Sequence, residues 1–157
     1  MRAIQLTFIK IPKPIASKTM AHHQRILRVQ TPGQSLLNIT QQVDTIVREA
    51  QVTTGLCTVF IRHTSASLVI QENADPDVLW DLERFLSQLV PEGWDYRHTA
   101  EGPDDMPAHL RSALTHTSEI IPIAQGRLVL GTWQGIYLWE HRKARHQREV
   151  VIHVWGD

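Results

Sequence analysis

The sequence has one cysteine, no excess of charge of either sign, and no long apolar run. Because Cys57 has no second cysteine to pair with, an internal disulfide framework is excluded, and we expect a cytoplasmic protein. Lysine plus arginine and aspartate plus glutamate each number 16, so the chain lacks the basic excess typical of nucleic-acid binders and membrane-surface binders. No apolar stretch approaches the roughly 20 residues of a membrane span. We therefore expect neither a nucleic-acid nor a membrane partner.

The length of 157 residues is enough for one domain with a sizeable core. Near the N-terminus, the apolar stretch 4–11 is interrupted by Lys10, Pro12 and Pro14, and no small-residue cleavage site follows it. We therefore do not expect a signal peptide. The sequence predicts a single domain over residues 20–157, preceded by an extension at residues 1–19 to which we assign no role.

Apolar spacing predicts three helices. The first begins with Thr40 as its cap and is stopped by Gly55, the second covers 78–89 after the cap Asp75, and the third opens near Met106 behind Asp104 or Asp105. Alternating or β-branched stretches predict seven strands, at 25–30, 56–63, 68–72, 120–123, 127–133, 136–140 and 148–155. Adjacent strands with short turns, such as Gln125-Gly126, indicate an α+β domain built on mostly antiparallel sheet.

The segment from Tyr96 to Leu110 holds two histidines, His98 and His109, among acids, prolines and a glycine. Proline and glycine restrict or permit special backbone angles, so the polar groups lie on a shaped loop. Imidazoles gathered with carboxylates are typical of a divalent-metal site or an acid–base centre. The alternative is a polar surface loop with two solvated histidines.

Three ionisable side chains share strand faces with core residues, namely His63, Glu140 and Arg148. A carboxylate on such a face requires a cation, a metal or a shifted pKa. If the last two strands pair across residues 141–147, Glu140 and Arg148 come close. The pattern fits a structural ion pair at least as well as direct catalysis by Glu140.

Two further segments offer ligand contacts. Thr64 and Ser65 follow a strand, where their hydroxyls and neighbouring amides suit an anion or simply form a serine/threonine turn. Trp133 and Gln134 lie between glycines, which suits an aromatic ligand but equally a bulge with a packed tryptophan. Asn73, at a strand end, is a further candidate for ligand contact. The residues from His141 to Arg148 form a basic loop, which is either a solvated surface or an attractor for a phosphorylated substrate.

Several ordered motifs resemble those of the YjbQ family of small bacterial and archaeal proteins, from about Met20 onward. They are His63-Thr64-Ser65-Ala66-Ser67, Glu72-Asn73-Ala74-Asp75-Pro76, Tyr96-Arg97-His98, the stretch from Glu101 to His109, Ile121-Pro122, Gly131-Thr132-Trp133-Gln134-Gly135, Glu140-His141-Arg142 and the closing Gly156-Asp157. Residues 1–19 have no counterpart in the family, and His116 stands where its members usually have glycine.

The resemblance implies sandwiched sheets, a homotrimer with sites near subunit boundaries, and a divalent metal, zinc or magnesium, held by His98 and His109. His63 or Glu140 would be a third contributor. The family is associated with a weak, secondary thiamine-phosphate synthase activity, in which pyrophosphate leaves a pyrimidine. On this basis the metal and Arg148 would neutralise the leaving group, Thr64 and Ser65 would bind phosphate, and Trp133 would stack on a heterocycle. Asn73, Asp105 and Gln134 complete the expected substrate-binding set.

The function we expect is that of a metal-binding enzyme acting on a phosphorylated heterocyclic substrate. Two alternatives remain: a non-catalytic binding protein for a small anionic metabolite, and a metal-dependent hydrolase with water in an open coordination position. All three require His98 and His109 to meet in one cavity.

Overall fold

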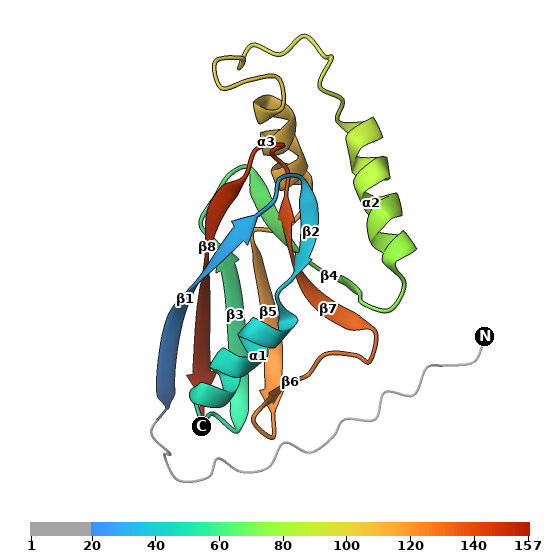
Figure 1. Cartoon of the computed structure of the whole chain (residues 1–157). Coiled ribbons are helices and arrows are strands. Elements are labelled where there is room, and N and C mark those ends of the chain that lie inside the picture. The colour runs from blue at the N-terminus through green and yellow to red at the C-terminus, as the bar shows by residue number, and fades with distance from the viewer. Residues whose placement is uncertain (1–19) are drawn as a thin grey trace, which may run out of the picture.

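The computed structural model describes residues 20–157, so the extension expected at residues 1–19 lies outside the described part of the chain. Two antiparallel sheets and three helices confirm the α+β fold (Figure 1). The larger sheet has the order β1 (Ala21–Thr31), β8 (His146–Gly156), β3 (Thr54–Ile61), β5 (Ser118–Ala124) and β6 (Arg127–Leu128). The smaller has the order β2 (Ser35–Asn38), β7 (Gln134–Glu140) and β4 (Ala66–Glu72). The helices are α1 (Thr40–Glu49), α2 (Pro76–Leu89) and α3 (Asp105–Leu114).

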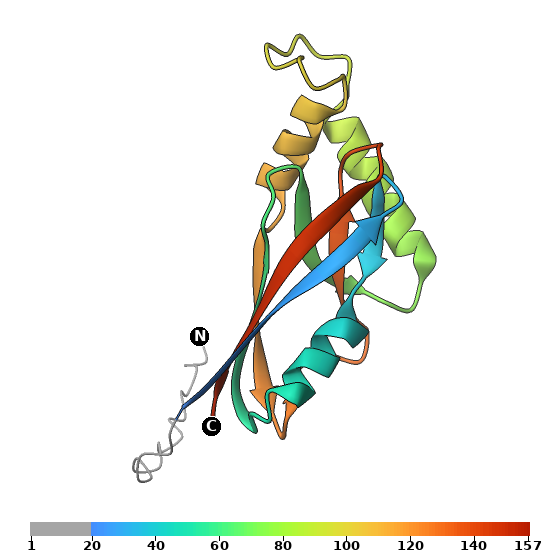
Figure 2. The same ribbon diagram turned by 60° about the vertical axis from the view of Figure 1, so that its left-hand side comes forward.

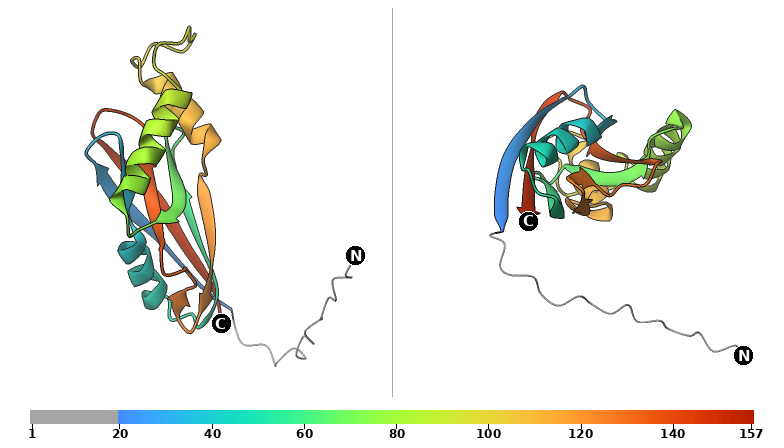
Figure 3. Two further views of the ribbon diagram at one scale, coloured as in Figure 1. Left: turned by 90° about the vertical axis from the view of Figure 1, so that its right-hand side faces the viewer. Right: turned by 90° about the horizontal axis from the view of Figure 1, so that it is seen from below.

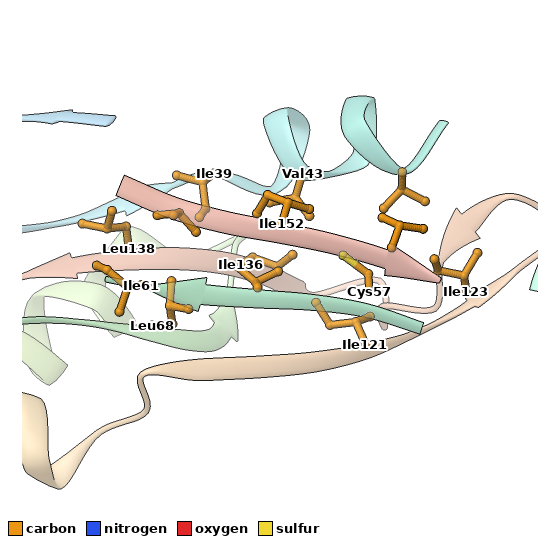
Figure 4. Packing of buried hydrophobic residues seen from close by; sticks show 14 of the residues in the cluster. Ile39, Val43, Cys57, Ile61, Leu68, Ile121, Ile123, Ile136, Leu138 and Ile152 are labelled. Atoms are coloured by element: carbon orange, nitrogen blue, oxygen red, sulfur yellow. The ribbon is translucent and has the colours of Figure 1, made fainter. Parts of the chain in front are cut away.

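The core lies between the two sheets and is closed on one side by α1 (Figure 4). Alternate residues of β3 and β8 point inward, as the period of a strand requires, and Val43 and Val47 of α1 meet them. Cys57 is buried there as a small apolar residue, and burial raises the pKa of its thiol to about 12. The packed residues include Ile39, Ile61, Leu68, Ile121, Ile136, Leu138 and Ile152.

Two local signals in the sequence are confirmed. Asp75 caps α2 through its side chain, which accepts from the Asp77 amide at 2.9 Å, and Pro76 follows at the first helical position. Gln125 and Gly126 have φ angles of 52° and 72°, which make the tight turn between β5 and β6.

Two predicted helix boundaries of α1 are wrong. Thr40 does not cap the helix; its hydroxyl accepts from the Ile136 amide at 2.8 Å and so ties α1 to β7. The helix ends at Glu49, and Gly55 lies inside β3. A Cβ at Gly55 would lie 2.1 Å from the carbonyl oxygen of Trp155, so the close approach of β8 explains why glycine is needed there.

The strand content also differs from the prediction. The strand expected at 127–133 is limited to Arg127–Leu128, because a turn in which the Gln134 amide donates to the Gly131 carbonyl at 2.9 Å interrupts it. The strand β2 was not predicted, since its four residues are too few to show a period. The last two predicted strands do not pair: β7 and β8 belong to different sheets.

The sheets run lengthwise from α1, at one end, to α3 and the loop 90–104, at the other (Figures 1 and 2). Helix α2 lies beside the outer face of the smaller sheet (Figure 3). Four segments meet at the α3 end: the end of β1, the β3–β4 connection, the end of β7 and the start of β8. Among residues 20–157, no helix is both long and apolar enough to cross a membrane.

Candidate metal centre

Two histidines and one aspartate meet at the α3 end of the molecule. His98 Nε2 lies 2.7 Å from Asp105 Oδ2, and His109 Nε2 lies 3.5 Å from the same oxygen. One potential ligand atom from each residue lies within 4.8 Å of the others, and the two imidazole centroids are 5.6 Å apart. The structure therefore brings together the two histidines assigned to a metal and adds Asp105, which had been assigned to substrate.

Local sequence explains this arrangement. Helix α3 begins at Asp105, so His109 is four residues on and lies on the same face of the helix. His98 reaches that face from the preceding loop, which Tyr96 anchors by donating its hydroxyl to the Pro91 carbonyl at 2.8 Å. Asp105 is buried, whereas both imidazoles remain partly accessible to solvent.

The backbone fixes the tautomer of His109. Its Nδ1 lies 2.9 Å from the Thr64 carbonyl oxygen, which can only accept, so Nδ1 carries the proton. In the neutral ring, Nε2 then presents a lone pair toward the Asp105 carboxylate. Two electron-rich atoms facing each other at 3.5 Å suit a positive group between them, either a proton or a cation.

Arg142 holds the other oxygen of Asp105. Its Nη1 donates to Asp105 Oδ1, and its Nε donates to Asp104 Oδ2 at 3.1 Å. Asp104 is the N-cap residue of α3, one of the two predicted, but its side chain makes no capping hydrogen bond and instead accepts from the Lys143 amide at 2.8 Å. Burial raises the pKa of Asp104, but the Lys143 amide and Arg142 outweigh it and hold that pKa below its usual value.

The basic loop after β7 is therefore not a solvated surface throughout. His141 and Arg148 are buried and Arg142 is largely covered, whereas Lys143 and Arg145 are exposed. Six of the eight residues from 141 to 148 are basic, but the sequence does not show which of them contact acidic side chains. Local reasoning did not distinguish Arg142, which contacts the cluster, from the other basic residues, because its partners lie 37 and 38 residues away.

Glu140 and Arg148 form a buried, two-point ion pair. Arg148 Nε and Nη2 each lie 2.6 Å from one oxygen of Glu140, and both side chains are at most 2 % exposed. Thr31 Oγ1 and the Arg142 amide donate to the same carboxylate at 2.9 and 3.0 Å. Every oxygen of Glu140 is thus engaged, which is the arrangement of the structural ion pair expected as the alternative to catalysis.

These hydrogen bonds hold the pKa of Glu140 low. Burial raises that pKa, but donation from Arg148 and from the Arg142 amide outweighs it, so the group stays ionised. The bond from Arg142 also connects the ion pair to the histidine–aspartate cluster. Glu140 fixes the backbone of Arg142, and the side chain of Arg142 fixes Asp105.

The connection between β3 and β4 lies against both groups. His63 Nδ1 contacts the Ser65 amide and hydroxyl, each at 3.1 Å, and Ser65 Oγ lies 3.4 Å from Arg148 Nη2. Burial, followed by Arg148, lowers the pKa of His63. The Thr64 side chain is exposed while its carbonyl orients His109. His63, Thr64 and Ser65 therefore lie at the same end of the molecule as the cluster.

Three residues predicted to bind substrate lie at the other end of the smaller sheet. The Asn73 amide donates to the Trp133 carbonyl at 3.0 Å, and Asn73 Nδ2 donates to the Gln134 carbonyl at 3.3 Å. The register pairs Glu72 with Gln134 at this end and Ala66 with Glu140 at the α3 end. Asn73, Trp133 and Gln134 are thus brought together with one another but not with His98 and His109.

His141 is a buried histidine to which the sequence assigned no role of its own. Its Nε2 lies 2.8 Å from Ser67 Oγ, and its ring packs 5.4 Å from that of Trp139. Burial lowers the pKa of His141 to about 3, with Arg111 and Arg148 acting in the same direction and Glu140 against them. His141 is therefore neutral at physiological pH.

We predict that removing one partner of the Glu140–Arg148 pair lowers the free energy of unfolding more than substituting both partners. Arg148→Met leaves a buried carboxylate without its cation and should lower the free energy of unfolding by about 3–5 kcal/mol. Adding Glu140→Gln removes that charge and should recover at least about 1 kcal/mol of the loss. Urea denaturation of the two single variants and the double variant measures this. Strictly additive losses would contradict a direct ion pair.

We also predict that stability falls below neutral pH because of His141. Its pKa is about 3 in the folded state against 6.5 ordinarily, so below pH 6.5 the unfolded chain binds a proton that the folded chain does not. The resulting loss is about 1.4 kcal/mol per pH unit, added to the loss from other groups. Urea denaturation between about pH 6.5 and pH 4.5 should show a slope shallower by about one proton in His141→Gln. Equal slopes would contradict the assignment.

Comparison with known proteins places the whole of this architecture in a single family. Residues 25–157 match the family described as UPF0047 protein YjbQ-like. The UPF0047 protein sll1880 of Synechocystis is 62 % identical over 143 residues, which is 90 % of this chain and 97 % of that protein. The UPF0047 protein YjbQ of Escherichia coli O157:H7 is 37 % identical over 136 residues, covering 86 % of this chain and 99 % of that protein.

Solved structures agree with the sequence relatives. A crystal structure described as a YbjQ-like protein of unknown function from Sulfolobus solfataricus superposes with a TM-score of 0.82 at 27 % identity, over 88 % of this chain and 99 % of that one. An uncharacterised YjbQ/UPF0047 protein of Clostridium acetobutylicum superposes with a TM-score of 0.74 at 37 % identity, over 83 % of this chain and 98 % of that one. The chain belongs to the YjbQ-like UPF0047 family.

Proposed function

We propose that the protein is a metal-binding enzyme whose centre is formed by His98, Asp105 and His109. The observation that carries the proposal is that His109 Nε2 faces a buried carboxylate oxygen at 3.5 Å while its Nδ1 donates to the Thr64 carbonyl. A metal-ligating histidine commonly donates its other ring nitrogen to such a carbonyl. A proton shared among the three side chains is the alternative that the experiment below separates from a cation.

The donor set favours zinc over magnesium. Two imidazole nitrogens with one carboxylate suit zinc, whereas magnesium prefers oxygen ligands in an octahedron. Three protein ligands leave a coordination position for substrate or water, which is typical of catalytic zinc sites. When bound, the ion would supply Lewis acidity toward a phosphate or carbonyl oxygen.

The chain's own residues would supply orientation and charge. Arg142 binds Oδ1 of Asp105 and leaves Oδ2 facing the histidines, while the Thr64 carbonyl orients His109. His63 is exposed at the same end of the sheets, where a phosphorylated ligand can receive its hydrogen bond, while the buried Ser65 hydroxyl contacts Nδ1 of the His63 ring. Since Arg148 is buried in a two-point ion pair with Glu140 and also contacts Ser65, we assign that pair to positioning Arg142 and the β3–β4 connection.

We retain a phosphorylated heterocycle as the substrate class, with thiamine-phosphate synthase as a secondary activity. Support comes from a partly exposed cluster of two imidazoles bordered by Arg142 and Lys143. A binding protein for a small anionic metabolite and a metal-dependent hydrolase use the same residues. Turnover decides between them, as set out below.

We predict that untagged protein binds about one zinc ion per chain and that His98→Ala, Asp105→Asn and His109→Ala each weaken zinc affinity by more than about 100-fold, since even outer-shell partners cost 10–100-fold. Isothermal titration calorimetry measures this. His116→Ala is the matched control, because His116 also faces a carboxylate, Glu119 at 2.9 Å, but lies outside the cluster. Full zinc affinity in the three variants would contradict the proposal.

A turnover assay on the same variants tests the enzyme. With a pyrimidine pyrophosphate and a thiazole phosphate as substrates, we expect His98→Ala and His109→Ala to lose product formation while His116→Ala keeps it. Release of inorganic phosphate from a single phosphorylated substrate would indicate the hydrolase instead. Tight ligand binding without turnover in the wild type would indicate the binding protein.

We further propose that copies of the chain assemble as a homotrimer through the apolar surface of α2 and α3. Phe85, Leu89 and Leu114 are exposed there and border a hollow of about 360 Å³ between α2 and the smaller sheet. Contiguous exposed apolar surface of this kind marks interaction sites.

We predict that Phe85→Glu shifts the mass measured by sedimentation equilibrium from three chains toward one, because a carboxylate would be buried without a partner. Trp80→Glu is the control. Trp80 is on the same helix and is 58 % exposed against 62 % for Phe85, but it does not line the hollow. A monomeric wild type would contradict the proposal.

A further inference from the structure

A second hollow, of about 320 Å³, lies in the loop before α3. Its lining includes two aromatic rings, Trp94 and Tyr96, whose centroids are 6.1 Å apart with planes inclined by 44°. Tyr96 is held by its hydrogen bond to the Pro91 carbonyl, whereas 61 % of Trp94 is exposed. One ring is therefore fixed and the other offers an open face to a ligand.

The hollow adjoins the candidate metal centre through His98. The imidazole lines the hollow, and its Nε2 lies 2.7 Å from Asp105 Oδ2. A ligand seated against Trp94 and Tyr96 therefore has His98 beside it and the cluster within its reach. An ion pair lies at the rim of the hollow: Lys143 Nζ is 2.8 Å from Oε2 of Glu92, which lines the hollow.

This location differs from the aromatic wall that the sequence indicated. Trp133 is as exposed as Trp94, at 64 %, but its backbone is bonded to Asn73 at the opposite end of the smaller sheet. An aromatic ring near Trp133 has no access to His98. The tryptophan that adjoins the cluster is Trp94, which carried no assignment from the sequence.

We propose that the hollow lined by Trp94, Tyr96 and His98 is the subsite for a planar aromatic ring of the ligand, whose anionic group reaches the His98–Asp105–His109 cluster. This inference rests on the proposed function, since the cluster must hold a cation for an anion to bind there. Trp94 supplies a flat apolar face at low entropic cost, and stacking selects planar rings over puckered ones. Trp94 is then a residue that determines specificity and contributes nothing to metal affinity.

The test uses two phosphonates with the same anionic group, phenylphosphonate and cyclohexylphosphonate, on zinc-loaded protein. Calorimetric titration should show roughly tenfold tighter binding of the planar ring to the wild type, the range expected for an aromatic contact. Trp94→Ala should abolish that preference while leaving zinc affinity and cyclohexylphosphonate affinity unchanged. Trp94→Phe should retain part of it.

Trp133→Ala is the matched control and should keep the full preference, because it removes an equally exposed tryptophan far from the cluster. A ring preference that persists in Trp94→Ala, or that disappears in Trp133→Ala, would overturn the inference while leaving the metal centre intact. A zinc-loaded wild type that binds both phosphonates equally would do the same. Absence of zinc binding in the wild type would instead overturn the proposed function, and this inference with it.

Discussion

The buried carboxylate of Glu140 is the constraint around which the functional end of the molecule is arranged. A charge in that position is tolerated only with full compensation, and Arg148, Thr31 and the Arg142 amide provide it from three different segments. Thr31 belongs to β1, Arg148 belongs to β8, and Arg142 follows β7. These contacts therefore fix the position of the two sheets relative to each other at this end. The geometry of the loop after β7 follows from that relation.

Arg142 transmits this constraint to the surface. Its amide is fixed by Glu140, and its guanidinium binds Asp104 and Asp105 at the start of α3. The helix therefore begins at a defined place, and His109 is presented four residues later beside the Thr64 carbonyl. A rigid, charge-compensated interior thus supports an accessible pair of imidazoles, which is the support that a preorganised metal centre needs.

The two ends of the molecule carry chemically similar side chains with different surroundings. Trp133, Gln134 and Asn73 bond among themselves at one end, and their polar groups are largely satisfied locally. Trp94 and Tyr96 lie in a loop that adjoins charged groups and a hollow. Trp94 and Trp133 therefore differ in their proximity to the cluster and not in residue type: Trp94 adjoins the proposed site, whereas Trp133 is part of a turn.

The sequence by itself determined the features that depend on neighbours along the chain: the cap at Asp75, the turn at Gln125-Gly126, the spacing of Asp105 and His109 on one helical face, and the α+β class. Local rules failed where a distant segment makes a competing contact. The Thr40 hydroxyl accepts a hydrogen bond from β7, and β8 packs closely against Gly55. The sequence suggested that Glu140 meets Arg148, but only the tertiary structure decided that they meet between two sheets and not across a hairpin, and that His109 meets a carbonyl 45 residues away. The physical reason is that these contacts depend on sheet register and packing, which no short stretch of sequence encodes.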